Sequence, residues 1–181
     1  TSSNKKYCNK PKTITNPNNN TTSYTYDATH GGVKTITKPT VTIKIASVNK
    51  IVTPVTTYTY TGYKPKSYNS AGVFTSAAQY IYRQTKVTQC RTASVCSGNE
   101  NELVKITHYD INENLLPDYE ITKSGSGSIS LRTDYEYDNY GNMTKKSGPH
   151  VKDDTYYFYD LRQRLIGEIG PNSDGQGRVG S

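Results

Sequence analysis

Four aspartates recur at the same place in a short motif, and no other residues in this sequence suggest chemistry more strongly. They follow tyrosine-containing stretches and are Asp27, Asp110, Asp138 and Asp160. Carboxylates that recur in this way could bind calcium or serve in acid–base catalysis. Each of them also lies where a tight turn is expected to begin, and there an aspartate accepts hydrogen bonds from backbone amides ahead of it. Because capping explains the pattern without a ligand, we expect a structural role.

The cysteines offer a second possible chemistry. Cys90 and Cys96 lie six residues apart in a polar loop, and Cys8 is left over. In an oxidising compartment the first two could form a disulfide, provided that their Cα atoms approach within ~7 Å. Two free thiols or a metal site are the alternatives, but a zinc site would need further Cys or His ligands at short spacing. We expect a disulfide, no metal and no cofactor.

The three histidines are scattered singly along the chain, at His30, His108 and His150. No spacing pairs any of them with a cysteine or serine nucleophile, although the sequence alone does not forbid a pairing in space. Glycine-rich segments match neither a phosphate loop nor a nucleophile elbow. We therefore expect structural or surface histidines and a protein that is not an enzyme.

The segment from Tyr135 to Thr144 predicts how one aspartate is held. Tyr135 and Tyr137 alternate, so both face one side of a strand. Asp138 then starts a turn, and Gly141 stands where a three-residue hairpin loop needs a positive φ. The return strand ends before Pro149, because proline cannot donate to a sheet ladder.

The same pattern recurs elsewhere in the chain. Asp138 and Asp160 are 22 residues apart, as are Pro149 and Pro171, so the aspartate-to-proline spacing is 11 in both copies. A copy near the start has a spacing of 12, and in the copy at Asp160 a glutamine, Gln163, replaces the turn glycine. A repeat of this kind determines the architecture. The remaining residues of these copies are Tyr24, Tyr26, Asp27 and Pro39, then Tyr109 and Asp110, then Tyr157 and Tyr159.

Composition favours an all-β fold with a thin core. Hydrophobic residues make up 32% of the 181, and tyrosine, with 17 copies against 2 Phe and no Trp, supplies most of the aromatic surface. A tyrosine ring buries area while keeping one polar end. We expect antiparallel hairpin repeats that form a twisted β-strip, with almost no helix. The expected segments are a polar leading segment over 1–22, degenerate repeats over 23–79 and clear repeats over 80–181.

The net charge of +7 could attract nucleic acid or acidic surfaces. The basic residues form no long run, however, so a solvated lysine-rich strand surface explains them better. We expect no nucleic-acid partner. No apolar stretch reaches the ~20 residues of a membrane span, and no signal peptide opens the sequence.

The repeat Tyr-x-Tyr-Asp-x-x-Gly-Asn-x-Thr, with a proline ending the return strand, resembles the YD repeats of the RHS family. The clearest copy covers residues 135–149. The segments around Cys90–Cys96, Asp153–Tyr157 and Ile169–Gly175 are also similar to bacterial RHS-repeat proteins. The resemblance covers about 80–177, with weaker similarity from about 24.

This resemblance implies a function that the repeats alone do not. RHS repeats build a β-strip that spirals into a hollow shell, which in secreted bacterial toxins encloses a C-terminal toxin domain. The chain would then be a non-catalytic segment of that shell, secreted or at the cell surface, with other RHS repeats of the same polypeptide and the toxin domain as partners. The alternative is a cell-surface adhesin or carbohydrate-binding module that uses exposed tyrosines.

Overall fold

The fold is all-β and antiparallel, as the repeats predict. The structure, a computed structural model, describes residues 6, 8–96, 98–110, 115–150 and 154–171, and these contain fifteen strands and no helix. The strands are β1 Thr13–Thr15, β2 Thr21–Tyr26, β3 Val33–Thr37, β4 Val41–Ile45, β5 Val48–Val52, β6 Val55–Tyr63, β7 Lys66–Tyr68, β8 Phe74–Ser76, β9 Ile81–Cys90, β10 Glu102–Tyr109, β11 Pro117–Ser124, β12 Ser130–Tyr137, β13 Met143–Ser147, β14 Asp154–Tyr159 and β15 Leu165–Ile169.

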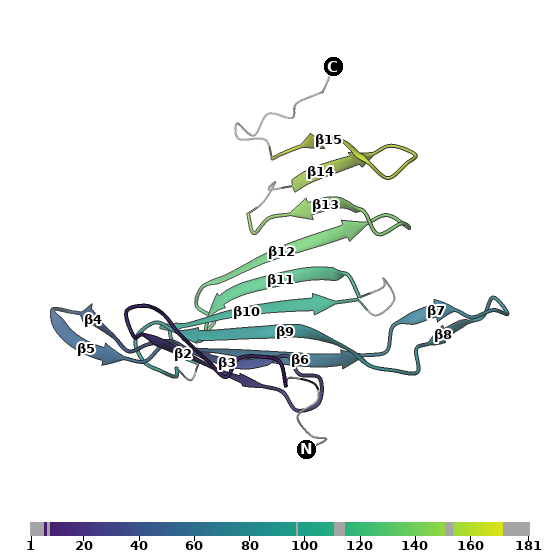
Figure 1. Cartoon of the computed structure of the whole chain (residues 1–181). Helices are drawn as coiled ribbons and strands as arrows, with labels where there is room; N and C mark the ends of the chain where they lie inside the picture. Colours follow the sequence, from purple (N-terminus) through teal and green to yellow (C-terminus); the bar gives the residue numbers. More distant parts are fainter. Residues whose placement is uncertain (1–5, 7, 97, 111–114, 151–153, 172–181) are drawn as a thin grey trace. The chain divides into compact units, whose positions relative to one another are not determined.

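Eleven of these strands form one sheet in the order β1-β2-β3-β6-β9-β10-β11-β12-β13-β14-β15 (Figure 1). The order follows the chain, so each strand of the sheet pairs with the strand that precedes it in the sheet. Two hairpins, β4–β5 and β7–β8, interrupt the succession and form two-stranded sheets of their own. The fold therefore consists of consecutive hairpins, with two additional hairpin arms.

By its contacts the chain divides into two compact units. Unit 1 comprises 1–62, 82–106 and 122–130, and unit 2 comprises 63–81, 107–121 and 131–181. The units interleave the three segments suggested by the sequence. In the polar leading segment, β1 is an ordered strand, because Thr13 pairs with Ser23 and Thr15 with Thr21.

The strands of unit 1 have two chemically different faces. Alternate residues of β1, β2, β3 and β6 are almost all threonine on one face, and hydroxyl pairs link them across the strands. Thr25 and Thr35 lie 2.6 Å apart at their Oγ1 atoms. The opposite face carries tyrosine and isoleucine, as the pairing of Tyr24 with Ile36 shows. One face therefore remains hydrated.

The buried core is thin. Among the described residues only five hydrophobic side chains are buried, and all are small or aliphatic. In unit 1 they are Val52, Cys90, Cys96 and Val104, and in unit 2 Leu115, which is 2% exposed. This agrees with the low aliphatic content, since backbone ladders and tyrosines, more than a packed interior, hold the sheet.

A missing aspartate explains where one arm departs from the sheet. Thr61 stands where a repeat would carry aspartate, and here no turn follows. Strand β6 instead continues to Tyr63, and the Thr61 hydroxyl lies 3.0 Å from that of Thr85 on β9. The chain then forms the β7–β8 arm before it returns as β9.

Candidate functional site: repeated turns, tyrosine contacts and a cavity

The turn at Asp138 has the geometry that its sequence predicts. The Asp138 amide donates to the Asn142 carbonyl at 2.9 Å, and the Gly141 amide donates to the Asp138 carbonyl at 3.0 Å. The Asp138 carboxylate accepts from the Tyr140 and Asn142 amides, both at 2.9 Å. Gly141 has a φ of 84°, in the region that glycine adopts without strain.

The turn at Asp160 is the same despite its glutamine. The Asp160 amide donates to the Arg164 carbonyl at 3.0 Å, and the Gln163 amide donates to the Asp160 carbonyl at 2.9 Å. The carboxylate accepts from the Arg162 and Arg164 amides at 2.8 and 3.0 Å. Gln163 takes a φ of 63°, and its side chain accepts a hydrogen bond from the Asn142 amide group of the preceding turn. This link offsets part of the cost of a left-handed glutamine.

The turn at Asp27 has one more residue in its loop but keeps the same two backbone hydrogen bonds. The Gly31 amide donates to the Asp27 carbonyl and the Asp27 amide to the Gly32 carbonyl, both at 2.8 Å. Gly31 has a φ of 75°, and a Cβ added there would lie 2.5 Å from the Lys6 carbonyl oxygen. A side chain at Gly31 would therefore meet both strain and a clash.

The fourth aspartate also bounds a turn. The Leu115 amide donates to the Asp110 carbonyl, and the Asp110 amide donates to the Leu116 carbonyl, both at 3.2 Å. Leu115 has a φ of 58° and is almost fully buried. Burial of the leucine side chain offsets the strain of its backbone, so the positive-φ position does not need glycine here.

Two further turns of this design use asparagine, and the aspartate pattern did not reveal them. The Asn69 side chain accepts from the Ala71 and Val73 amides at 3.0 and 2.9 Å, and Gly72 has a φ of 73°. Asn16 accepts from the Asn18 and Asn20 amides, both at 3.0 Å. An amide oxygen caps as a carboxylate does, so a search that allowed Asn or Asp at this position could have found them.

Hydrogen bonding to the turn amides lowers the pKa of three of the repeat aspartates below their ordinary value. For Asp138 the main cause is the Asn142 side-chain amide, for Asp160 the Arg164 backbone amide, and for Asp27 the Thr29 backbone amide. These bonds stabilise the ionised form. In the described part of the chain, no three His, Cys, Asp or Glu residues come together in a group that could hold a metal. The geometry is that of turn caps.

The tyrosine before three of the four repeat aspartates joins one hairpin to the previous part of the chain. The Tyr159 hydroxyl donates to the Met143 carbonyl at 3.0 Å, and the Tyr137 hydroxyl donates to the Pro117 carbonyl at 2.8 Å. Both carbonyls belong to the first residue of the preceding return strand. Tyr60 makes the same contact with Val33 at 3.0 Å, although its repeat lacks the aspartate.

The copy nearest the start differs slightly, since the Tyr26 hydroxyl reaches the Pro11 carbonyl, at 2.6 Å, just before β1. These contacts, hereafter the tyrosine staples (Tyr26, Tyr60, Tyr137 and Tyr159), bind consecutive hairpins through the backbone. They add a specific role for the repeated tyrosine that periodicity alone did not predict.

The first tyrosine of each repeat has other contacts. The Tyr135 hydroxyl lies 3.1 Å from the Glu120 carboxylate, and burial, then this carboxylate, raises the pKa of Tyr135 to about 12. Tyr157 pairs with Glu168 across β14 and β15. The ring of Tyr109, which directly precedes Asp110, packs edge-on against Tyr63 with centroids 6.1 Å apart. None of these tyrosines lines the cavity of unit 1 described below.

The repeat prolines lie at one position relative to the strands. Pro39, Pro149 and Pro171 each stand two residues beyond the last residue of β3, β13 and β15. A residue without an amide hydrogen ends the ladder there.

Cys90 and Cys96 form a disulfide with their Cα atoms 5.2 Å apart, while Cys8 is exposed and unbonded to another cysteine. Both half-cystines are buried, and the Ala93 amide donates to the Cys90 sulfur at 3.2 Å. The bridge closes the loop between β9 and β10 and contributes much of the small core of unit 1.

His30 and His108 both have structural contacts. The Gly32 amide donates to His30 Nδ1 at 3.0 Å, and the His30 ring stacks on Tyr82 with centroids 4.6 Å apart. His108 stacks on Tyr119 at 4.7 Å and contacts Asp118 at 2.7 Å. Neither histidine is in contact with a serine or cysteine nucleophile in these interactions.

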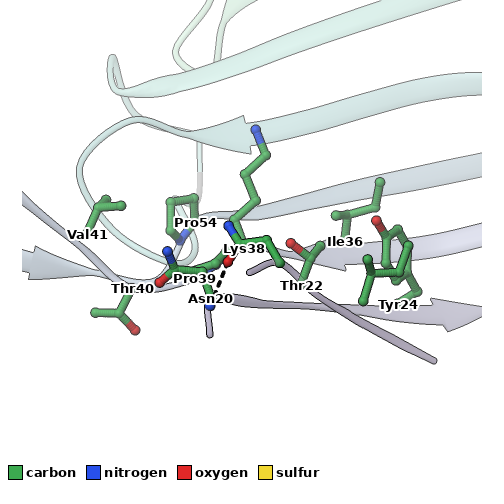
Figure 2. Close-up of a pocket in the computed structure, with 11 residues that line it drawn as sticks. Asn20, Thr22, Tyr24, Ile36, Lys38, Pro39, Thr40, Val41 and Pro54 are labelled. Atoms are coloured by element: carbon green, nitrogen blue, oxygen red, sulfur yellow. Dashed lines mark hydrogen bonds between the residues drawn. The ribbon is translucent and has the colours of Figure 1, made fainter. Parts of the chain in front are cut away.

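A cavity of about 650 Å³ lies in unit 1, at the base of the β4–β5 arm (Figure 2). Its lining combines apolar side chains with amide and hydroxyl groups, and Lys38 is its charged residue. The lining residues are Ile14, Asn16, Asn20, Thr22, Tyr24, Ile36, Lys38, Pro39, Thr40, Val41 and Pro54. Tyr24, the first tyrosine of its repeat, is the one repeat tyrosine that lines it.

No helix in the described residues is long and apolar enough to cross a membrane. No protein-family model matches the chain, and no curated protein sequence matches it either. The family resemblance therefore rests on the repeats themselves.

Proposed function

We propose that this chain is a structural segment of an RHS-repeat β-strip, which in a secreted bacterial protein encloses and shields a toxin domain. The observation that carries the proposal is one unit used again and again: a capped turn, a positive-φ residue and a tyrosine staple, in a sheet whose strands follow chain order. Such a unit adds strands indefinitely, as a spiralling strip requires. The mechanism is steric enclosure.

The sheet edges support the same proposal. β1 and β15 are the outermost strands, and each has one neighbouring strand among the described residues. Strand β15 exposes apolar side chains, with Ile166 68% and Ile169 54% exposed, and carries no lysine or proline to discourage pairing. Further repeats of the same polypeptide would cover this edge.

Secretion or surface display belongs to this proposal. The Cys90–Cys96 disulfide supports it, because such bridges persist in oxidising environments. The adhesin or glycan-binding alternative would have to use exposed tyrosines such as Tyr68 and Tyr140, because the hydroxyls of Tyr137 and Tyr159 are bonded to backbone carbonyls.

The test is light scattering coupled to size exclusion, on the whole chain over a range of concentrations. An uncovered strip edge recruits partners, so we expect association that grows with concentration. Ile166→Lys on β15 should reduce this association, whereas Leu161→Lys, a control at a fully exposed turn residue, should not. A monomer of 20.1 kDa at every concentration would contradict the proposal and favour the binding module.

A further inference from the structure

The β4–β5 arm is a hairpin with little support. It forms a two-stranded sheet, so within the described chain the outer edge of each strand lacks a paired neighbour. An isolated hairpin of this kind is marginally stable in water. It nevertheless exposes large apolar side chains: Val48 is 67%, Ile51 73% and Val41 44% exposed.

One face of the arm continues into the cavity. The register pairs Val41 with Val52, Ile43 with Lys50 and Ile45 with Val48, so these side chains share a face. Val41 also lines the cavity, together with Pro39 before it and Pro54 beyond β5 (Figure 2). An apolar surface thus runs from the cavity along β4.

The backbone of β4 can accept another strand. A two-residue turn, Ala46-Ser47, closes the hairpin, and the pair Ile45–Val48 next to it is the kind that exchanges both ladder hydrogen bonds. Alternation then turns the amide and carbonyl groups of Thr42 and Lys44 away from β5. These groups form the free edge of β4, beside the cavity.

The charge of unit 1 indicates what kind of strand would pair. The unit carries thirteen Lys and Arg but three acids, a net of +10. All three acids accept hydrogen bonds locally, as when Asp27 caps its turn. The lysines nearest the arm form no ion pair with any described residue; they are Lys38, Lys44 and Lys50.

We propose that the free edge of β4 binds an extended acidic peptide segment, which adds as a third strand and places one apolar side chain in the cavity. Main-chain bonds to Thr42 and Lys44 would give affinity, and the cavity and lysines would give specificity. Ile14, Ile36 and Pro54 would contact that apolar side chain. The proposal does not depend on the shell.

The test measures binding of a short fluorescent peptide of alternating Glu and Val to the whole chain by polarisation. We expect saturable binding that weakens as salt is raised. A peptide with Lys in place of Glu should bind far more weakly. Binding of the two peptides with equal affinity, or no binding of the acidic one, would overturn the proposal.

Two proline variants locate the edge. Thr42→Pro removes an outward amide of β4 without touching the β4–β5 ladder, so it should weaken binding by about tenfold or more. Its cross-strand partner gives the control: Ile51→Pro blocks the outer edge of β5 and should leave binding unchanged. Unchanged melting curves would show that both variants fold. If Thr42→Pro binds like the parent, the assignment is wrong.

A second pair of variants tests the charge. Lys38→Ala at the cavity should weaken binding up to about fivefold, as for an exposed ion pair. Lys34→Ala changes the same residue type on β3, four residues before Lys38 and outside the cavity, and should have no effect. Equal losses in both variants, or competition by a polyuronate at equivalent charge, would show a general polyanion surface and overturn the peptide site.

Discussion

One position of the repeat turn has a positive φ, which glycine adopts without strain and other residues adopt only at a cost. Gly141 and Gln163 occupy equivalent places with φ values of 84° and 63°. A left-handed conformation costs a non-glycine residue roughly 1–2 kcal/mol. The two turns therefore store different strain within nearly identical hydrogen-bond patterns.

This difference predicts opposite effects of exchanging the two residue types. Gly141→Ala should lower the free energy of unfolding by about 1 kcal/mol, because alanine is strained at a φ of 84°. No clash adds to this cost, since the new Cβ would meet only Leu116, at an ordinary 3.6 Å. Gln163→Gly should raise it by up to about 1 kcal/mol, since the strain relieved exceeds one exposed hydrogen bond to Asn142. Urea denaturation measures both. Equal signs would contradict the turn equivalence.

At the scale of the element, the tyrosine staple makes two neighbouring hairpins depend on each other. The Tyr159 hydroxyl of β14 bonds the first residue of β13, Met143, beside a bulge that shifts the register between Phe158 and Tyr159. The same shift occurs before Tyr26 and Tyr137. The bulge and the staple recur together in all three hairpins.

Tyr159→Phe should therefore destabilise the last hairpins while leaving their apolar contacts in place. The loss is about 0.5–1.5 kcal/mol, the net worth of a half-buried hydrogen bond. Tyr140→Phe is the control, because Tyr140 is 78% exposed and contributes its amide, not its hydroxyl, to the Asp138 turn. Amide hydrogen exchange in β13 and β14 reads the effect locally. If the amides of β13 and β14 exchange at equal rates in both variants, the Tyr159 hydroxyl does not stabilise these hairpins.

Sequence reasoning reached the hairpins more readily than the contacts between them. The alternation around Tyr135 and Tyr137, the aspartate and the glycine are local signals, and each maps onto a strand or a turn. Turn residues around Asn69 and Gly72 indicate a turn, but the aspartate pattern does not relate it, or the Asn16 turn, to the repeat turns. The staple to Met143 and the cavity beside Tyr24 depend on which strands become neighbours, which single-strand periodicity does not encode.

At the scale of the whole molecule, the capped carboxylates make stability depend on pH. Hydrogen bonds lower the pKa of several acids in the folded chain, namely Asp27, Glu100, Asp138, Asp154 and Asp160. In the unfolded chain the pKa of an aspartate is about 3.9. The unfolded state thus binds protons first as pH falls, and the stabilisation present above that value is lost as pH drops through the lower folded values.

Thermal melts from neutral pH downward should accordingly be flat until about pH 4 and then fall steeply. Asp138→Asn should keep the turn, as the natural Asn16 and Asn69 turns do, while reducing the acid-dependent part of the decline. Asp138→Ala should lower the melting temperature at every pH. An Asn variant that melts like the Ala variant at neutral pH would show that the carboxylate, and not an oxygen acceptor, is required.

The two arms have a consequence for how such a chain gains new parts. Strands β3 and β6 pair directly, as do β6 and β9, although a whole hairpin is inserted within each connection. The pairing of β6 with β3 and with β9 therefore does not require a short connection. Between Tyr63 and Ile81, another hairpin could replace β7 and β8, and the sheet would keep its ladder while it gained a new recognition surface. The first connection allows less, because its Val52 belongs to the core of unit 1.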